Sequence, residues 1–170
     1  QGMDNLVKLA ELLQAPVIDR LTRMNMPNTH YLCQTERGGG LIAAADCILS
    51  LEPVDLYGQF NEVIDQLERV ARPRIGKGAR LIAISTRDLS VRANYQDFQR
   101  YMSVDLSIAG DAQSTLPILI EAVQRELTAN RRNAIDARGA AMREAYGGFA
   151  VRARAEAALA WDATPISSAR

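Results

Sequence analysis

Two short apolar runs, at 80–84 and 104–109, bracket a polar segment rich in aromatic residues. Each run lacks clean alternation and ends at polar or glycine positions, which is typical of a strand buried on both faces of a parallel sheet. Between them, Tyr95, Phe98 and Tyr101 are spaced three apart, which predicts one or two helical turns against an apolar surface. We therefore expect this region to form the rim of a sheet, where α/β proteins usually hold ligands and partners.

The rest of the chain alternates between helical and strand patterns, with Asp4 and Thr115 as expected helix caps. This alternation indicates a parallel sheet with right-handed crossovers. An all-helical bundle is disfavoured because the apolar runs are too short and too closely bracketed to be helices. Apolar spacing predicts helices over 4–13, 41–45, 60–71 and 115–127, and short apolar runs predict two further strands over 16–19 and 46–51.

Both ends of the chain depart from a self-contained α/β domain. The chain enters on a helix, so the first strand, which is usually internal, is expected to be missing. Residues 130–161 are rich in alanine and arginine, with a predicted break at Gly147-Gly148. The prediction is a three-layer, Rossmann-like α/β domain with a mostly parallel sheet over 1–128, followed by a helical linker over 129–170.

Composition narrows the classes of partner. The chain has 170 residues, enough for one domain, and acidic and basic residues balance at 20 each. This balance predicts neither nucleic acid nor a membrane surface as a partner. Cys33 and Cys47 fit no metal or redox spacing, and Cys47 is expected to be a small core residue. We see no signal peptide or membrane-length apolar run, and a reducing cytoplasm is the expected location.

Several segments together carry a resemblance to a known family, and NYQDFQRY at 94–101 is the most specific of them. The others are APVID at 15–19, RMNMP at 23–27, ADCIL at 45–49, LIAIS at 81–85, VDL at 104–106 and GDA at 110–112. In this order and spacing, over about residues 4 to 128, the chain resembles the central domain of thiamine-diphosphate-dependent enzymes of the acetolactate synthase and benzoylformate decarboxylase type.

The resemblance implies an enzyme built from a pyrimidine-binding, a central and a diphosphate-binding domain. Such a parent would act on 2-keto acids or related carbon–carbon bonds, using thiamine diphosphate and Mg²⁺. This chain would be its non-catalytic central domain, which positions the other two domains and contributes to packing in a homo-oligomer. No catalytic or metal-binding residue is therefore expected here. In agreement, the Gly-Asp-Gly metal motif is absent, and its nearest string, at 110–112, has no Asn-Asn partner after it.

The alternative is a free-standing module that binds FAD or NAD. Its candidate residues are Ser85 and Asp88, after the third strand, and Asp111, after the fourth. We do not expect bound FAD, because the glycine-rich turn that cradles phosphate would follow the missing first strand.

Three other features have simpler interpretations. Gly38-Gly39-Gly40 lacks the Lys-Ser/Thr ending of a phosphate-binding loop and is interpreted as a flexible loop. His30 has no carboxylate, serine or cysteine fixed beside it by spacing, so it is interpreted as a surface residue. The three aromatics of the rim could stack on a flat ligand, but packing against the sheet or a neighbouring domain is the favoured interpretation.

Overall fold

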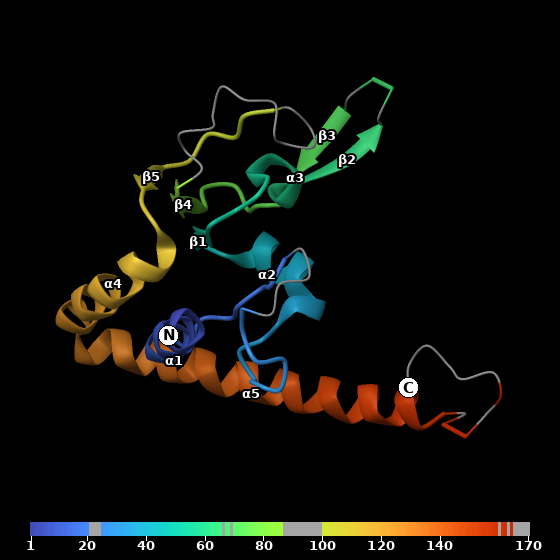
Figure 1. Ribbon diagram of the computed structural model, residues 1–170. Helices are drawn as coiled ribbons and strands as arrows, with labels where there is room; N and C mark the ends of the chain where they lie inside the picture. Colours follow the sequence, from blue (N-terminus) through green and yellow to red (C-terminus); the bar gives the residue numbers. More distant parts are fainter. Residues whose placement is uncertain are drawn as a thin grey trace.

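The computed structural model of the chain describes residues 1–20, 25–65, 67–68, 70–86, 100–159, 161–162 and 164. It is a mixed α/β arrangement with a three-stranded parallel sheet and a separate antiparallel hairpin (Figure 1). The helices are α1 (Gly2–Leu13), the short 3₁₀ turn η1 (Thr35–Arg37), α2 (Gly38–Ala44), α3 (Leu56–Phe60), α4 (Ala112–Glu126) and α5 (Ala129–Ala158). The strands are β1 (Cys47–Leu51), β2 (Asn61–Asp65), β3 (Val70–Pro73), β4 (Arg80–Ser85) and β5 (Leu106–Ala109).

The larger sheet has the strand order β1–β4–β5, and both of its pairings are parallel. β4 is central: Leu81, Ala83 and Ile84 are buried, and Ile82 is half-buried. The strands predicted over 46–51 and 80–84 are therefore confirmed. An apolar run without alternation is what a central parallel strand requires, because both of its faces are covered.

β5 confirms the strand predicted over 104–109 but not its burial. All four of its residues are exposed, with Leu106 at 50% and Ile108 at 36%. Within the described residues β5 pairs on one side only, with β4. The expectation of burial on both faces was wrong for this run. A short apolar run without alternation is compatible with an edge strand as well as with a central strand, so the pattern does not separate the two.

The helix predicted over 60–71 was wrong, because this region forms the β2–β3 hairpin. The Asp65 carboxylate accepts hydrogen bonds from the backbone N–H groups of Leu67 (2.8 Å) and Glu68 (3.1 Å). Such a side chain competes with the helical backbone for donors and starts a turn instead. Two of the apolar residues that suggested a buried helical face are exposed, Ile64 at 54% and Leu67 at 96%, whereas Phe60 at the end of α3 is buried.

Several smaller expectations also need correction. The strand expected over 16–19 is reduced to one parallel bridge, between Val17 and Cys33. The glycines at 38–40 form the first turn of α2, not a flexible loop. Cys47 is exposed rather than a core residue.

The expected helix caps also differ from those observed. The first helix begins at Gly2 with Gln1 as its N-cap, so Asp4 is not the cap. The cap of α4 is Asp111 rather than Thr115, and Pro117 lies inside that helix beyond the first turn.

Buried apolar side chains form two clusters that share no residue. The helix cluster comes from α1, α5 and the loop residues between Val17 and Cys33, and the sheet cluster comes from α2, α3 and the parallel sheet. Val17 and Ile18 are adjacent in sequence and belong to different clusters. The helix cluster is Ala10, Met26 and Leu32 with Val7, Val17, Tyr31, Cys33 and Met142. The sheet cluster is Ile42, Phe60 and Leu81 with Ile18, Ile48, Leu56, Ile75, Met102 and Val104.

The predicted helical linker is a single helix, α5, without a break at Gly147-Gly148. Its first half runs beside α1, and its second half extends past the rest of the molecule (Figure 1). The Arg138 guanidinium donates hydrogen bonds to the backbone carbonyls of Leu13 and Gln14, at the C-terminal end of α1. The last carbonyls of a helix have no N–H donor within the helix. A guanidinium at this end therefore supplies hydrogen bonds and also complements the negative end of the helix dipole.

Gly139 on α5 lies against the side chain of Gln14, the residue that follows α1. A Cβ atom at this position would lie 2.1 Å from Gln14 Oε1 and 2.9 Å from Gln14 Cγ. The Gln14 side chain cannot move away freely, because it accepts a hydrogen bond from Tyr31 Oη (2.7 Å) and donates one to the Glu11 carbonyl (2.7 Å). A side chain at position 139 would therefore displace Gln14 from these hydrogen bonds.

We predict that Gly139→Ala destabilises the protein by about 1–3 kcal/mol, because the new methyl group displaces the Gln14 side chain from both hydrogen bonds. Urea unfolding followed by circular dichroism measures the change. The matched control is Gly147→Ala on the same helix, since a Cβ there has nothing within 4 Å. This control should stabilise by up to ~1 kcal/mol through helix propensity alone. Equal effects of the two substitutions would contradict the proposed contact.

Candidate functional site

The carboxyl edge of the parallel sheet is where three strands end and where ligands usually bind in α/β proteins. β1 ends before Glu52, β4 ends at Ser85 before Thr86, and β5 leads through Gly110 to Asp111, the N-cap of α4. We refer to Glu52, Ser85, Thr86, Gly110 and Asp111 as the carboxyl rim.

Glu52 is the centre of the carboxyl rim. Its Oε2 atom accepts hydrogen bonds from Ser85 Oγ (3.3 Å), Thr86 Oγ1 (3.3 Å) and the Thr86 backbone N–H (3.4 Å). Its Oε1 atom accepts from the backbone N–H of Ala112 (3.1 Å), the first residue of α4. A carboxylate at a helix N-terminus is favourable because the unpaired N–H groups and the helix dipole both attract negative charge. One side chain therefore joins β1, β4 and α4.

The backbone at Glu52 is in the left-handed region, with φ +45°. This conformation costs a residue with a side chain about 1–2 kcal/mol relative to ordinary backbone geometry. The Glu52 N–H donates to the Ile84 carbonyl (2.9 Å), so the strand pairing continues up to the strained residue. The strain turns the chain sharply at the end of β1, and the hydrogen bonds of the Glu52 carboxylate help to offset its cost.

Asp111, the residue directly before α4, is the N-cap of this helix. Its Oδ1 atom accepts a hydrogen bond from the Ser114 backbone N–H (2.8 Å). Hydrogen bonds from Ser114 lower the pKa of the Asp111 carboxyl below its ordinary value. The carboxylate is therefore the form that the fold stabilises.

Two of the three predicted rim residues meet at this edge. Ser85 bonds Glu52 directly, and Asp111 lies next to Ala112, which bonds the same carboxylate. Asp88 lies outside the described residues. Sequence reasoning missed Glu52, although an acidic residue placed directly between a strand and a proline was a usable signal for it.

The chemistry of the rim does not suit a phosphate group. At α4 the Glu52 Oε1 atom already accepts from the Ala112 N–H, one of the donors that a nucleotide phosphate or a diphosphate would need, and a second anion would meet like-charge repulsion. The residues present therefore do not fit thiamine diphosphate or the diphosphate of FAD. Across the part of the chain that the structure describes, no three His, Cys, Asp or Glu side chains converge as metal ligands do.

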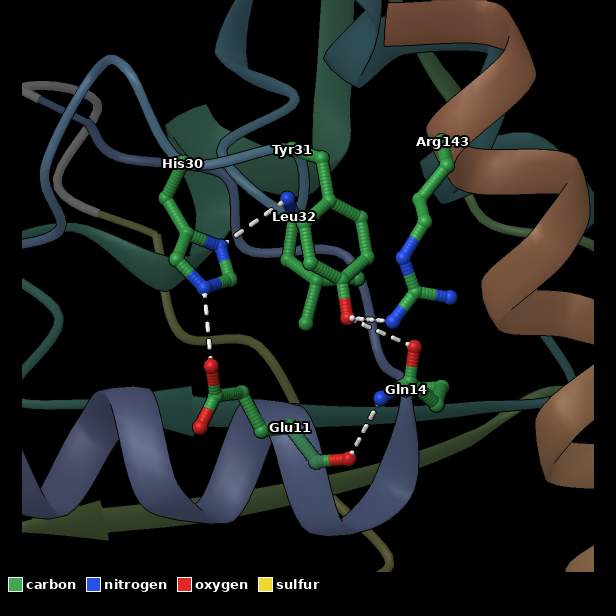
Figure 2. Close-up of polar contacts among 6 residues, drawn as sticks. All are labelled: Glu11, Gln14, His30, Tyr31, Leu32 and Arg143. Atoms are coloured by element: carbon green, nitrogen blue, oxygen red, sulfur yellow. Dashed lines mark hydrogen bonds and ion pairs between the residues drawn. The ribbon is translucent and has the colours of Figure 1, made fainter.

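A second polar cluster joins α5 to α1 around Tyr31 (Figure 2). The Tyr31 hydroxyl donates to Gln14 Oε1 and accepts from Arg143 Nη2 (2.9 Å). The Arg143 guanidinium carbon also lies 4.2 Å from the centroid of the Tyr31 ring, and the His30 ring stacks on Tyr31 at 4.8 Å. These contacts hold the 26–34 loop between the two helices.

His30 is part of this cluster and not the isolated surface residue expected from the sequence. Its Nδ1 atom accepts from the Leu32 backbone N–H (3.1 Å), so Nε2 carries the proton and donates to Glu11 Oε1 (3.1 Å). Figure 2 shows both nitrogens engaged in this way. Because neither nitrogen is left for a substrate, this histidine positions the loop and does not act as a general base.

The amino edge of the sheet is closed by Asp105. Its Oδ2 atom accepts from the Leu81 backbone N–H (2.8 Å) and its Oδ1 atom from Arg80 Nη1 (2.9 Å). The Leu81 hydrogen bond, followed by the one from Arg80, lowers the pKa of Asp105. Partial burial, with Asp46 and Asp105 nearby, raises the pKa of the Cys47 thiol, so the reactive thiolate is disfavoured there.

Only part of the aromatic segment lies within the described residues. Tyr101 is 63% exposed, and Tyr95 and Phe98 lie outside the described residues. Next to it, Arg100 donates to Tyr57 Oη (2.8 Å), and Met102 packs into the sheet cluster. Residues 100–104 belong to no helix or strand, so the predicted helical turns do not include Tyr101.

No family model, curated protein or solved structure matches the chain. In the described residues no helix is long and apolar enough to cross a membrane.

We predict that Asp111→Ala lowers the free energy of unfolding more than Asp111→Asn does at about pH 7, because asparagine keeps a capping oxygen and loses only the charge. Since the fold lowers the pKa of Asp111, the wild-type advantage over Asp111→Asn is present above about pH 4. It should disappear as the pH falls through the lowered pKa. Urea unfolding across this pH range is the measurement, and a gap between the two proteins that does not change with pH would contradict it.

Proposed function

We propose that the chain is the non-catalytic central domain of a thiamine-diphosphate-dependent enzyme acting on 2-keto acids or related carbon–carbon bonds. In this proposal the domain is Rossmann-like, and it positions the pyrimidine-binding and diphosphate-binding domains and supports a homo-oligomer. The ordered motifs between about residues 4 and 128 and the parallel arrangement of β1, β4 and β5 support it.

The Glu52 carboxylate is the observation that separates this proposal from a dinucleotide-binding module. In a nucleotide-binding α/β domain the carboxyl edge offers free N–H groups to phosphate. Here the Glu52 carboxylate takes the Ala112 N–H and both donors of Thr86. An edge that supplies its own anion serves as a structural joint, which suits a domain that holds others in place.

The exposed face of β5 also favours a role between domains. Leu106 and Ile108 present aliphatic surface, with Tyr101 exposed shortly before them in the chain. An uncharged, exposed edge strand is unusual for a domain that works alone, because it invites pairing with other chains. In a multidomain enzyme a neighbouring domain covers such a surface.

Titration calorimetry on the 170-residue chain tests the proposal directly. We predict no binding of FAD, of NAD, or of thiamine diphosphate with Mg²⁺ at concentrations up to about 1 mM. Binding of FAD or NAD that Ser85→Ala and Asp111→Ala abolish would favour the dinucleotide-binding module. Binding that survives both substitutions would place the ligand elsewhere, and would equally contradict a purely structural domain.

The protein encoded by the complete gene provides the second arm of the test. It should release CO₂ from pyruvate or another 2-keto acid only when thiamine diphosphate and Mg²⁺ are present. Glu52→Gln in that protein should lower stability and leave the KM for the 2-keto acid unchanged, since the proposal assigns the chemistry to the other two domains. A gene product without pyrimidine-binding and diphosphate-binding domains would overturn the proposal.

A further inference from the structure

Glu52 links parts of the molecule that belong to different apolar clusters. β1 and β4 contribute Ile48 and Leu81 to the sheet cluster. α4 packs against α1, which contributes Val7 and Ala10 to the helix cluster, and the two helices lie together beside α5 (Figure 1). The Glu52 carboxylate therefore runs from the sheet to the layer formed by α1, α4 and α5.

The link uses donors from both sides. Oε2 is bound by Ser85 and Thr86 at the end of β4, and Oε1 is bound by Ala112 at the start of α4. Ser85 and Ala112 are both more than nine-tenths buried. If the carboxylate were removed, the N–H of Ala112 would lose its acceptor in a place that water reaches poorly.

The left-handed backbone at Glu52 is a second, separate observation. A glycine would adopt φ +45° without strain, so the turn alone does not call for glutamate. The chain nevertheless places there a long acidic side chain that reaches two other elements. The side chain, and not the turn, explains which residue stands at this position.

We propose that the Glu52 carboxylate couples the parallel sheet to the layer of α1, α4 and α5. While its hydrogen bonds are intact, the sheet and this layer unfold locally together. We call this carboxylate the latch. Without it, the end of β4 and the start of α4 open independently of the rest of the fold. This coupling does not rest on the proposed function and holds for the chain whatever its function.

Native-state hydrogen exchange on the 170-residue chain tests the latch. In Glu52→Gly the backbone strain is relieved while the carboxylate is lost, so any local destabilisation reflects the lost side chain. Exchange should accelerate about tenfold or more at both the Thr86 amide, directly after β4, and the Ala112 amide, at the start of α4. Sodium acetate should slow exchange at both amides relative to sodium chloride at equal ionic strength, because acetate restores a carboxylate to the vacated position.

Three further variants serve as controls. Glu121→Gln makes the matching change on the exposed surface of α4 and should leave both amides unchanged. Asp111→Ala should accelerate the Ser114 amide and not the Thr86 amide, since it removes only the cap of α4. Glu52→Gln keeps the length of the side chain and one acceptor, so it should fold even if the glycine variant does not, with smaller accelerations at the same two amides.

Unchanged exchange at Thr86 and Ala112 in both Glu52 variants would overturn the latch. Acceleration at Ala112 alone would also overturn it, because Glu52 would then be only a second helix cap.

Discussion

β4 is held at both ends by carboxylates that its two neighbouring strands supply. At its start, Asp105, which precedes β5, accepts the Leu81 backbone N–H (2.8 Å). At its end, Glu52, which follows β1, accepts from Ser85 and Thr86. Where the hydrogen-bonded ladder of a central strand stops, backbone N–H groups are left without a partner from the sheet. Buried donors of this kind need an acceptor from elsewhere in the chain. Since each acceptor comes from a flanking strand, the register of the sheet and the satisfaction of its ends depend on each other.

The sequence predicted those parts of the fold in which the apolar pattern is compatible with only one type of secondary structure. Short runs without alternation located β1 and β4, and periodic leucines located α1. The hairpin at 61–73 was missed because its apolar residues happen to fall at helical spacing, and the Asp65 turn decides the outcome locally. The rim was foreseen only through Ser85 and Asp111, because a pattern of apolar residues carries no information about which carboxylate will fold back onto it. Glu52 needed the three-dimensional convergence of β1, β4 and α4.

α5 shows why a weak apolar stripe does not settle how a helix behaves. Its stripe is thin, and Val151 and Leu159 remain exposed at 67% and 70%. The helix is attached through its first half, where Met142 packs into the helix cluster, Arg138 reaches the end of α1 and Arg143 reaches Tyr31. Glycine at 139 leaves room beside α5 for the Gln14 side chain, which bonds Tyr31 in the same cluster. Attachment by arginine and a small residue depends on geometry more than on buried area, which apolar periodicity cannot reveal.

The hydrogen bonds of Glu52 also affect whether the carboxyl edge of the sheet can bind an anion. Open α/β sheets bind anionic cofactors at this edge because helix N-termini there lack acceptors. Here Glu52 fills that need from within the chain, so the N-terminus of α4 is satisfied without a ligand. An anion that arrived at this helix would have to displace a carboxylate held by donors on two elements, and the released charge would stay close by and repel it. A fold that completes its own rim gains an edge that is rigid in the absence of any cofactor. Under the proposed function, such an edge would suit a domain whose surfaces position others, with the ligand chemistry in the domains proposed beside it.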